Sequence, residues 1–228
     1  MLRALSQAVD YVRFGRHYRK FKPYTMINRR QFLENLILAK EALSNPKLYH
    51  GAVIECGTWK GGMAAALIEI GGSERNYYFF DSFEGLPPAE DIDGKSAKDY
   101  QADTSNPGYF DNCRASLADI KSAVSLTGCP PSHINIRPGF FENSFPVFDP
   151  PPIALLRLDA DWYSSTKICL EKFWEHVLPD GLILIDDYYT WDGCAHAVHE
   201  FLHVNKASER IRQGRIGGTA FIQRRNSN

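Results

Sequence analysis

The chain has 228 residues, of which 44% are hydrophobic and 13% aromatic. This is enough for one sizeable core and short of the usual length of two domains. Acidic and basic residues nearly cancel, 27 against 26, so no strong overall charge points to nucleic acid or an anionic membrane surface as a partner. We therefore expect a single domain spanning 1–228 that binds a small molecule.

The cysteine content indicates the compartment. Five cysteines are scattered along the chain without a CxxC pair, and an odd number argues against a disulfide framework. No apolar run approaches the roughly 18 to 20 residues that span a bilayer, and the N-terminus lacks the apolar stretch of a signal peptide. The sequence predicts a cytoplasmic protein with no membrane partner.

Residues 1–45 are predicted to form a helical arm. In the first helix we expect a solvated basic face and a packed face made of Leu2, Leu5, Val9 and Val12. This apolar and basic segment is also a candidate surface for a homo-oligomer. A second helix is expected from a cap at Asn28 to about residue 43, where Ser44-Asn45-Pro46 supplies a stop.

Short apolar runs then alternate with helical patterns, which is typical of a parallel sheet covered by helices on both faces. The runs cover residues 52–56, 76–81, 134–138, 153–159 and 182–186. Two further runs, 210–216 and 219–224, meet at Gly217-Gly218, a composition that favours a tight hairpin. The sequence therefore predicts an α/β fold with an antiparallel C-terminal edge.

Residues 83–112 form a polar stretch rich in Gly, Pro and Asp. It has little periodicity and is too long for an ordinary connection in a compact domain. We expect a lid-like insertion over a ligand, with a partly disordered insertion as the alternative.

The first predicted strand leads into a helix through a glycine-rich turn, Glu55 to Gly62. A dinucleotide fingerprint needs GxGxxG, and Trp59 occupies a position where that motif requires glycine. Gly57 would instead let the backbone approach a ligand, Glu55 could meet an ammonium group, and the helix N-terminus favours a carboxylate. The methionine end of S-adenosylmethionine carries both groups, and Asp81, at the end of the second strand, is placed to accept the two ribose hydroxyls.

Four carboxylates follow two later strands: Asp159 and Asp161 after one, Asp186 and Asp187 after the next. Unpaired carboxylates cost several kcal/mol each to bury, so a hard divalent cation such as Mg²⁺ is the economical explanation. Such an ion could acidify an acceptor hydroxyl while a nearby Asp takes the proton. The alternative is that Asp161 and Asp187 only cap a helix and a turn.

With these motifs in place, the chain resembles the macrocin O-methyltransferase family, whose members methylate hydroxyls of sugars and other natural products. The resemblance covers most of the sequence and rests on several strings in the same order. These are Tyr24-Thr25-Met26, Glu55 to Gly62, Asp81 to Pro87, Gly139-Phe140-Phe141, Leu158 to Thr166 and Asp186-Asp187-Tyr188.

The resemblance implies a class I methyltransferase fold: a Rossmann-like sheet of seven mostly parallel strands with a reversed last hairpin. It also implies an S-adenosylmethionine-dependent, Mg²⁺-dependent O-methyltransferase, a metal on Asp159, Asp186 and Asp187, and Asp159 or Asp161 as the catalytic base. The cofactor contacts that it implies are Thr25, Met26, Glu55, Gly57, Thr58, Gly61, Gly62, Asp81, Ser82, Gly139, Phe140 and Asp159.

Two alternatives come from other classes of protein. The string His199-Glu200-Phe201-Leu202-His203 matches the HExxH pattern of zinc metalloproteases, although a solvated helix face explains it as well. A non-catalytic small-molecule-binding protein on the same fold is the second. It would bind the cofactor and transfer nothing.

Overall fold

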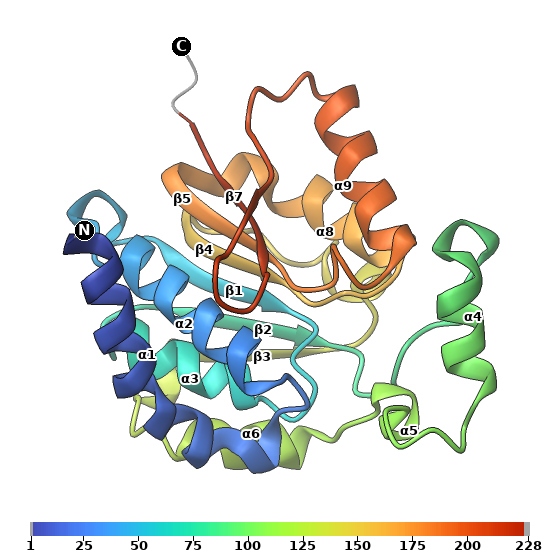
Figure 1. The fold of residues 1–228 in the computed structure, drawn as a ribbon, viewed down its shortest axis with the longest axis horizontal. Coiled ribbons are helices and arrows are strands. Elements are labelled where there is room, and N and C mark those ends of the chain that lie inside the picture. Colours follow the sequence, from blue (N-terminus) through green and yellow to red (C-terminus); the bar gives the residue numbers. More distant parts are fainter. Residues whose placement is uncertain (1, 226–228) are drawn as a thin grey trace.

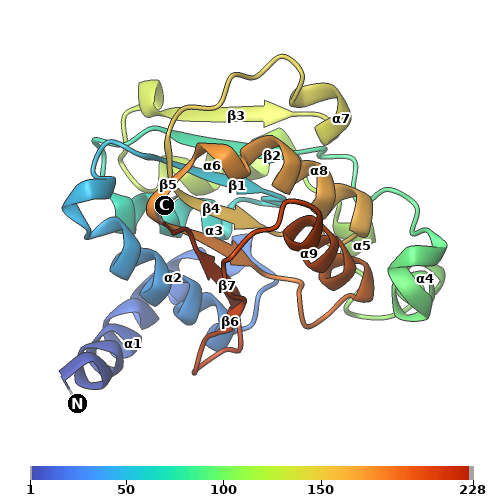
Figure 2. The same cartoon turned by 90° about the horizontal axis from the view of Figure 1, so that it is seen from above.

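A computed structural model describes residues 2–225 of the chain, with side chains from residue 9 onward. Seven strands form one sheet in the order β3-β2-β1-β4-β5-β7-β6, with β6 and β7 antiparallel (Figure 1). Figure 2 shows this order from β3 at one edge to β6 at the other. The strands are β1 Ala52–Cys56, β2 Tyr77–Asp81, β3 Ile134–Pro138, β4 Ile153–Leu158, β5 Val177–Ile185, β6 Arg212–Gln213 and β7 Ala220–Gln223.

Helices cover both faces of the sheet, and no helix among the described residues is long and apolar enough to cross a membrane. The α-helices are α1 Leu2–Phe21, α2 Arg29–Leu43, α3 Gly62–Gly71, α4 Gly94–Ala102, α5 Phe110–Cys113, α6 Leu117–Ser125, α7 Phe141–Ser144, α8 Tyr163–Phe173 and α9 Asp192–Val204. The 3₁₀ turns are η1 Lys22–Tyr24, η2 Pro46–Leu48, η3 Asp91–Asp93, η4 Pro131–His133 and η5 Trp174–His176.

The alternation of side chains along the strands divides the interior into two cores. Leu155 and Leu184 pack with α1, α2, α3 and α6, whereas Leu156 and Ile183 point to the opposite face, against α8 and α9. Because successive side chains point to opposite faces, an apolar run of five or six residues serves both cores. The predicted parallel sheet with two covered faces is therefore confirmed.

The packed face of α1 differs from the predicted one. Val9 and Val12 are exposed, at 64% and 77%, whereas Phe14 and Phe21 are buried in the core. Larger aromatic side chains bury more apolar area than valines, so the helix turns its aromatic stripe inward. The predicted packing of Leu2 and Leu5 lies outside the described side chains, and the homo-oligomer stays a prediction.

The second helix and the hairpin follow their predicted signals. Asn28 caps α2, since its Oδ1 accepts a hydrogen bond from the backbone N–H of Gln31 at 3.1 Å. The hairpin strands β6 and β7 are shorter than the predicted runs. Glu34 of α2 holds the turn between them, accepting from the backbone N–H groups of Ile216 and Thr219. The strand β5 begins five residues before the predicted apolar run.

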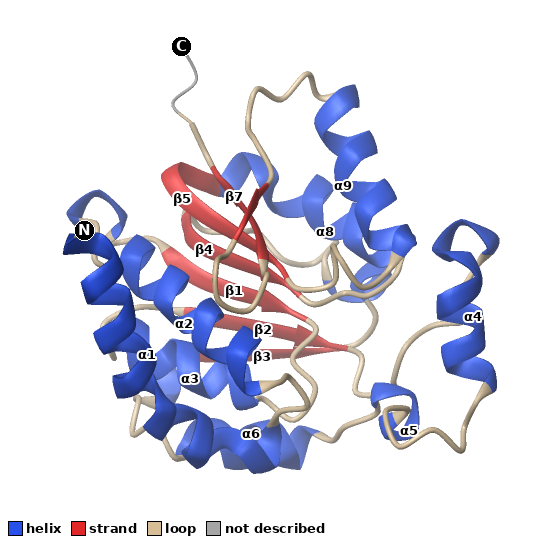
Figure 3. Ribbon diagram, in the orientation of Figure 1, coloured by secondary structure: helices blue, strands red, loops and turns tan. Residues whose placement is uncertain are grey.

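The insertion at 83–112 contains regular structure that its composition did not predict. It carries η3 and α4, and α4 lies at the periphery of the molecule (Figure 3), where its Tyr100 packs on Trp191 at the start of α9. Near its end Phe110, Asp111, Asn112 and Cys113 all have positive φ, between 49° and 58°. This left-handed turn costs about 1–2 kcal/mol per residue, and hydrogen bonds between Asn112 and Leu86 hold it closed, one in each direction.

Candidate active site

One cavity of about 370 Å³ opens at the carboxyl ends of the central strands, the edge where open α/β sheets bind ligands. It lies between the glycine-rich turn after β1, the acidic ends of β4 and β5, and the insertion. The predicted site residues that line it are Thr25, Met26, Glu55, Gly57, Thr58, Asp81, Ser82, Phe140, Asp159, Asp161, Asp186 and Asp187. The cavity lining does not include Gly61, Gly62 or Gly139.

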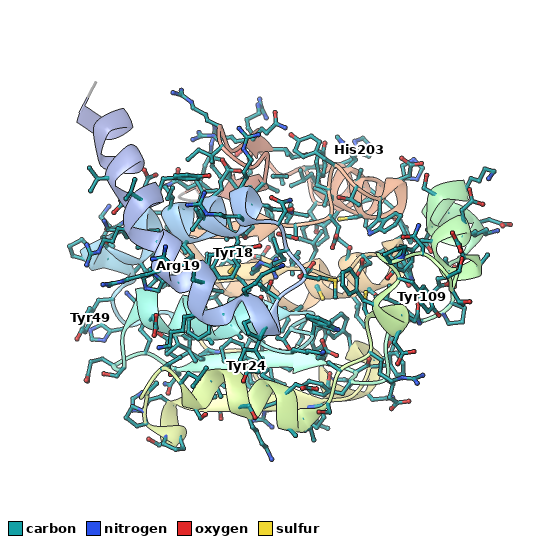
Figure 4. The ribbon with its side chains drawn as sticks, turned by 60° about the horizontal axis from the view of Figure 1, so that its bottom comes forward. Tyr18, Arg19, Tyr24, Tyr49, Tyr109 and His203 are labelled. Atoms are coloured by element: carbon teal, nitrogen blue, oxygen red, sulfur yellow. The ribbon has the colours of Figure 1, made fainter. Side chains whose placement is uncertain are left out.

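The glycines of the turn are required by packing inside the protein. A Cβ on Gly57, which has φ +82°, would lie 1.7 Å from the backbone oxygen of Asp159. A Cβ on Gly62 would lie 2.6 Å from the backbone oxygen of Tyr24, which Figure 4 labels at the end of the arm. The turn is therefore pressed between the loop after β4 and the arm. The close contact with Asp159 explains why residue 57 is a glycine, without the predicted approach of the backbone to a ligand.

Asp81 fixes the shape of the same turn. One carboxylate oxygen accepts the backbone N–H groups of Thr58 and Trp59, both at 2.8 Å, and the other accepts that of Phe83 at 2.7 Å. Burial raises the pKa of Asp81, and these three N–H donors work against that shift. Asp81 thus holds the turn and also lines the cavity.

Glu55 lies at the floor of the cavity with no exposed surface. Its Oε1 accepts a hydrogen bond from Arg157 at 2.7 Å, while its Oε2 is buried with no hydrogen-bond partner in the described structure. Burial raises the pKa of Glu55 to about 8, in spite of the guanidinium of Arg157. An unpartnered buried carboxylate oxygen beside a cavity suits a cationic donor from a ligand.

The ends of β4 and β5 bring three carboxylates together. The backbone hydrogen bonding of the sheet continues one residue past β4 and β5, from Asp159 to Cys56 and from Asp186 to Leu158. Asp159 and Asp186 therefore lie side by side, and one carboxylate oxygen each of Asp159, Asp186 and Asp187 lies within 4.8 Å of the others. Convergence at one edge, which the sequence predicts, is confirmed for these three acids.

The charges of this cluster are only partly compensated. Burial raises the pKa of Asp186 to about 6. Burial and the neighbouring carboxylates raise the pKa of Asp187, and likewise that of Asp161, well above the ordinary range. A cluster of oxygen ligands with excess negative charge fits a hard divalent cation.

Asp161 and Asp187 do not act as caps. The start of α8 has no side-chain cap from its own segment, and the N–H of Tyr163 is instead bound by Asp93 of the insertion at 2.7 Å. Asp187 accepts the backbone N–H of Asp161, whose own carboxylate accepts Trp191 Nε1 at 3.0 Å. The capping alternative is therefore wrong for both residues.

The sequence matches the macrocin-O-methyltransferase (TylF) family over residues 10–224. The chain belongs to this family. The match covers nearly all of the described structure of this macrocin-O-methyltransferase family member. It therefore includes the glycine-rich turn, the insertion and the acidic cluster.

The curated relatives are named as O-methyltransferases. The chain is 29% identical over 180 residues to the 8-demethyl-8-(2,3-dimethoxy-alpha-L-rhamnosyl)-tetracenomycin-C 4′-O-methyltransferase of Streptomyces olivaceus, covering 76% of this chain and 66% of the relative. It is also 29% identical over 165 residues to the mycinamicin III 3″-O-methyltransferase of Micromonospora griseorubida, covering 71% and 64%. The chain thus spans about two thirds of the length of these relatives.

Solved structures show the same fold. The O-methyltransferase NovP aligns with a TM-score of 0.73 at 20% identity, over 89% of this chain and 83% of that one. The calicheamicin methyltransferase CalS11 aligns with a TM-score of 0.61 at 24% identity, over 83% and 78%. The predicted class I methyltransferase fold is therefore confirmed.

Several residues of the site were missed by reasoning from the sequence. Arg157 binds three of the acids from within β4, and Asn35 and Gln31 of α2 reach Asp186. Trp191 and Tyr100 form an edge-to-face pair at the mouth of the cavity. A charged residue inside the apolar run IALLRLD was the available signal for Arg157, because arginine is almost never fully buried without partners.

The HExxH string is a helix surface. His199 and Glu200 lie on α9, where Glu200 binds Tyr163 and Lys167 and His199 binds Tyr188. Figure 4 shows His203 on the same helix, away from Tyr24 and the arm. Among the described residues, the acidic triad is the one group of His, Cys, Asp or Glu side chains close enough to share a metal. The predicted solvated face explains the string.

Proposed function

We propose that this chain is an S-adenosylmethionine-dependent, Mg²⁺-dependent O-methyltransferase. It acts on a hydroxyl of a small molecule, a sugar or another natural product, in the cytoplasm. The observation that carries the proposal is that a single cavity joins the glycine-rich turn to the three clustered carboxylates. Family membership and the named acceptors of the relatives support the same reaction class.

The chain's own residues suit the cofactor. The unpartnered Oε2 of Glu55 can accept from an ammonium group, and the arm supplies Thr25 and Met26 on the facing wall of the cavity. Asp81 and Ser82, at the end of β2, lie where a ribose would be bound. S-adenosylmethionine bound here would supply the methyl group as an electrophilic sulfonium.

Asp159, Asp186 and Asp187 would hold the cation. Their side chains offer oxygen ligands only, which Mg²⁺ prefers, and the excess negative charge favours its binding. A divalent cation there lowers the pKa of an acceptor hydroxyl. The cavity has room beside the triad for such an acceptor, between Asp159 and the aromatic pair Tyr100 and Trp191.

The reaction needs a residue that takes the acceptor proton. As the bond between methyl and acceptor oxygen forms, the bond between methyl and sulfur breaks and the sulfur keeps the electron pair. The hydroxyl proton passes to a carboxylate, for which Asp159 and Asp161 are the candidates because both line the cavity. Asp161 lies outside the metal-binding triad, so the two roles can be separated by mutation.

Two measurements test the proposal. Calorimetry should show S-adenosylmethionine binding and no comparable binding of NAD. A methyl-transfer screen over glycosylated and phenolic acceptors should give product that EDTA abolishes and Mg²⁺ restores. Full transfer in chelator would remove the metal from the proposal. Cofactor binding without transfer to any acceptor would favour the non-catalytic alternative.

A further inference from the structure

Arg157 is a fully buried arginine whose partners come from four different elements. Its Nη1 donates to Glu55 of β1 at 2.7 Å and to Asp159 after β4 at 2.9 Å. Its Nε donates to Asn35 of α2 at 3.2 Å, and its Nη2 lies 2.7 Å from Asp186 Oδ1 after β5, in an ion pair that lacks hydrogen-bond geometry. The arginine has 0% exposed surface, so its side chain is held in one conformation by the surrounding residues.

These contacts occupy one carboxylate oxygen of each of two acids. Arg157 binds Oδ2 of Asp159 and Oδ1 of Asp186. Each of these acids is thereby left with one further oxygen for a cation. Asn35 Nδ2 lies 3.4 Å from the same Asp186 oxygen, so that oxygen is held from two sides. Asp187, the third acid of the triad, makes no ion pair with Arg157 among the described residues.

We infer that Arg157 is a positioning residue for the cation. Its planar guanidinium sets the orientation of Asp159 and Asp186, so that each presents one oxygen toward the point shared with Asp187. This inference rests on the proposed metal site. It goes further in assigning the geometry of that site to a residue that does not itself bind the metal.

Two simpler roles for Arg157 predict different behaviour. It could serve only as a positive charge among the acids, in which case a lysine would replace it. It could serve only as the buried partner of Glu55, in which case removing both members of that pair would leave cation binding unchanged. The planar guanidinium group of arginine can bind several acceptors at fixed angles, whereas the ammonium group of lysine cannot.

The test is a titration of the full chain with Mn²⁺ in the absence of cofactor. The electron paramagnetic resonance signal of the free ion gives the concentration of unbound Mn²⁺ and hence the dissociation constant. Arg157→Lys keeps the net charge of the cluster and loses the fork. We expect its Mn²⁺ affinity to fall about 10- to 100-fold, the usual effect of losing a residue that orients metal ligands. Arg224→Lys is the matched control, because Arg224 is a largely buried arginine that pairs with Glu209 outside the cavity lining; its Mn²⁺ affinity should stay within about twofold of wild type, well short of that range.

A second variant carries the test if Arg157→Lys fails to fold. Glu55→Gln combined with Arg157→Met removes both members of the buried Glu55–Arg157 pair and leaves Asp159 and Asp186 without their guanidinium partner. The same loss of Mn²⁺ affinity is expected. Wild-type affinity in either folded Arg157 variant would overturn the inference and leave the metal proposal standing. No Mn²⁺ binding by the wild-type chain would overturn both.

Discussion

At the scale of single residues, the carboxylates of the site differ in what surrounds them. The Asp159 side chain is 28% exposed toward the cavity and is bound by Arg157. Asp161 has a positive φ of 57°, a conformation that few non-glycine residues adopt, and its carboxylate is bound by Trp191. Strain of this kind is common at functional sites. The two acids therefore lie close together in different chemical settings.

Substitution should separate these two acids. Asp159→Asn is expected to lose both cation binding and methyl transfer, because it removes a ligand of the triad. Asp161→Asn should retain Mn²⁺ binding and lose transfer about 10²- to 10⁴-fold, the usual contribution of a general base. Mn²⁺ titration together with transfer rates measures both effects. Unchanged transfer by Asp161→Asn would assign the proton to Asp159.

The raised pKa of Glu55 predicts how stability depends on pH. Its value of about 8 lies above the ordinary 4.5. Between these values the folded chain holds a proton that the unfolded chain has released, so this residue makes the free energy of unfolding decrease as pH rises. Glu55→Gln should therefore show a shallower decrease in urea unfolding between about pH 5 and about pH 8 in chelator. An equal slope in both proteins would contradict the assignment.

The sequence predicts the acids of the site better than their partners. Asp159, Asp186 and Asp187 follow apolar strands, and parallel strands end at a common edge, so their convergence follows from periodicity alone. The partners of Arg157 depend on which strands are neighbours and on how α2 lies against the sheet. Neither is visible in a local pattern. The contact between Gly57 and Asp159 joins two loops that lie far apart in the sequence, and it was missed for the same reason.

At the scale of elements, the insertion is attached to the start of α8. Asp93 accepts the N–H of Tyr163, and Trp162 Nε1 donates to the backbone oxygen of Pro87 at 2.9 Å. Trp162 is almost completely buried and packs edge to face on Trp191. The segment that carries Asp161 is therefore held between the insertion and the sheet.

Loss of the Asp93 contact should loosen the insertion. Asp93→Ala removes the acceptor at the start of α8, and capping contacts of this kind stabilise proteins by about 1 kcal/mol. We expect a lower thermal midpoint and faster proteolysis within 83–112. Glu84→Gln is the control, because Glu84 is an exposed acid of the same segment. Equal proteolysis of both variants would argue against this role of Asp93.

Prediction of elements succeeded where burial is periodic. The predicted runs 52–56 and 134–138 have the observed bounds of β1, which is fully buried, and of the edge strand β3, which is partly exposed. In contrast, α4 was not predicted, because Ala97 is the one buried residue of that helix and leaves no apolar stripe in the sequence. The face of α1 was predicted from aliphatic residues, whereas its aromatic residues make the contact. The local sequence of a helix with both an aliphatic and an aromatic face does not show which face the rest of the chain will bury.

At the scale of the whole molecule, negative charge is concentrated at one edge of the sheet while the net charge of the chain is −1. Burial, together with repulsion among the acids, raises the pKa of Asp161 and of Asp187 at that edge. Binding of a cation removes the repulsion and requires deprotonated ligands. If the triad binds the proposed cation, stability, cation concentration and pH are linked in this protein.

Mg²⁺ should raise the thermal midpoint of the wild-type chain. At 100 times the dissociation constant the gain is about 2.7 kcal/mol, roughly 5 to 10 °C for a chain of this size. The gain should be larger at about pH 8 than at about pH 5, where protons compete for the carboxylates. Differential scanning fluorimetry with Asp187→Asn as control measures it. A Mg²⁺ shift of equal size in that variant would show that the effect arises elsewhere.

The close contact between Gly57 and the backbone of Asp159 has one more consequence. The turn proposed to seat the cofactor and the loop proposed to hold the cation share a wall, with no side chain between them. We expect two ligands bound against a common wall to be thermodynamically coupled, and such coupling is reciprocal. Whatever factor the cofactor applies to the affinity for Mg²⁺, Mg²⁺ applies to the affinity for the cofactor, so neither constant is a property of its own site alone.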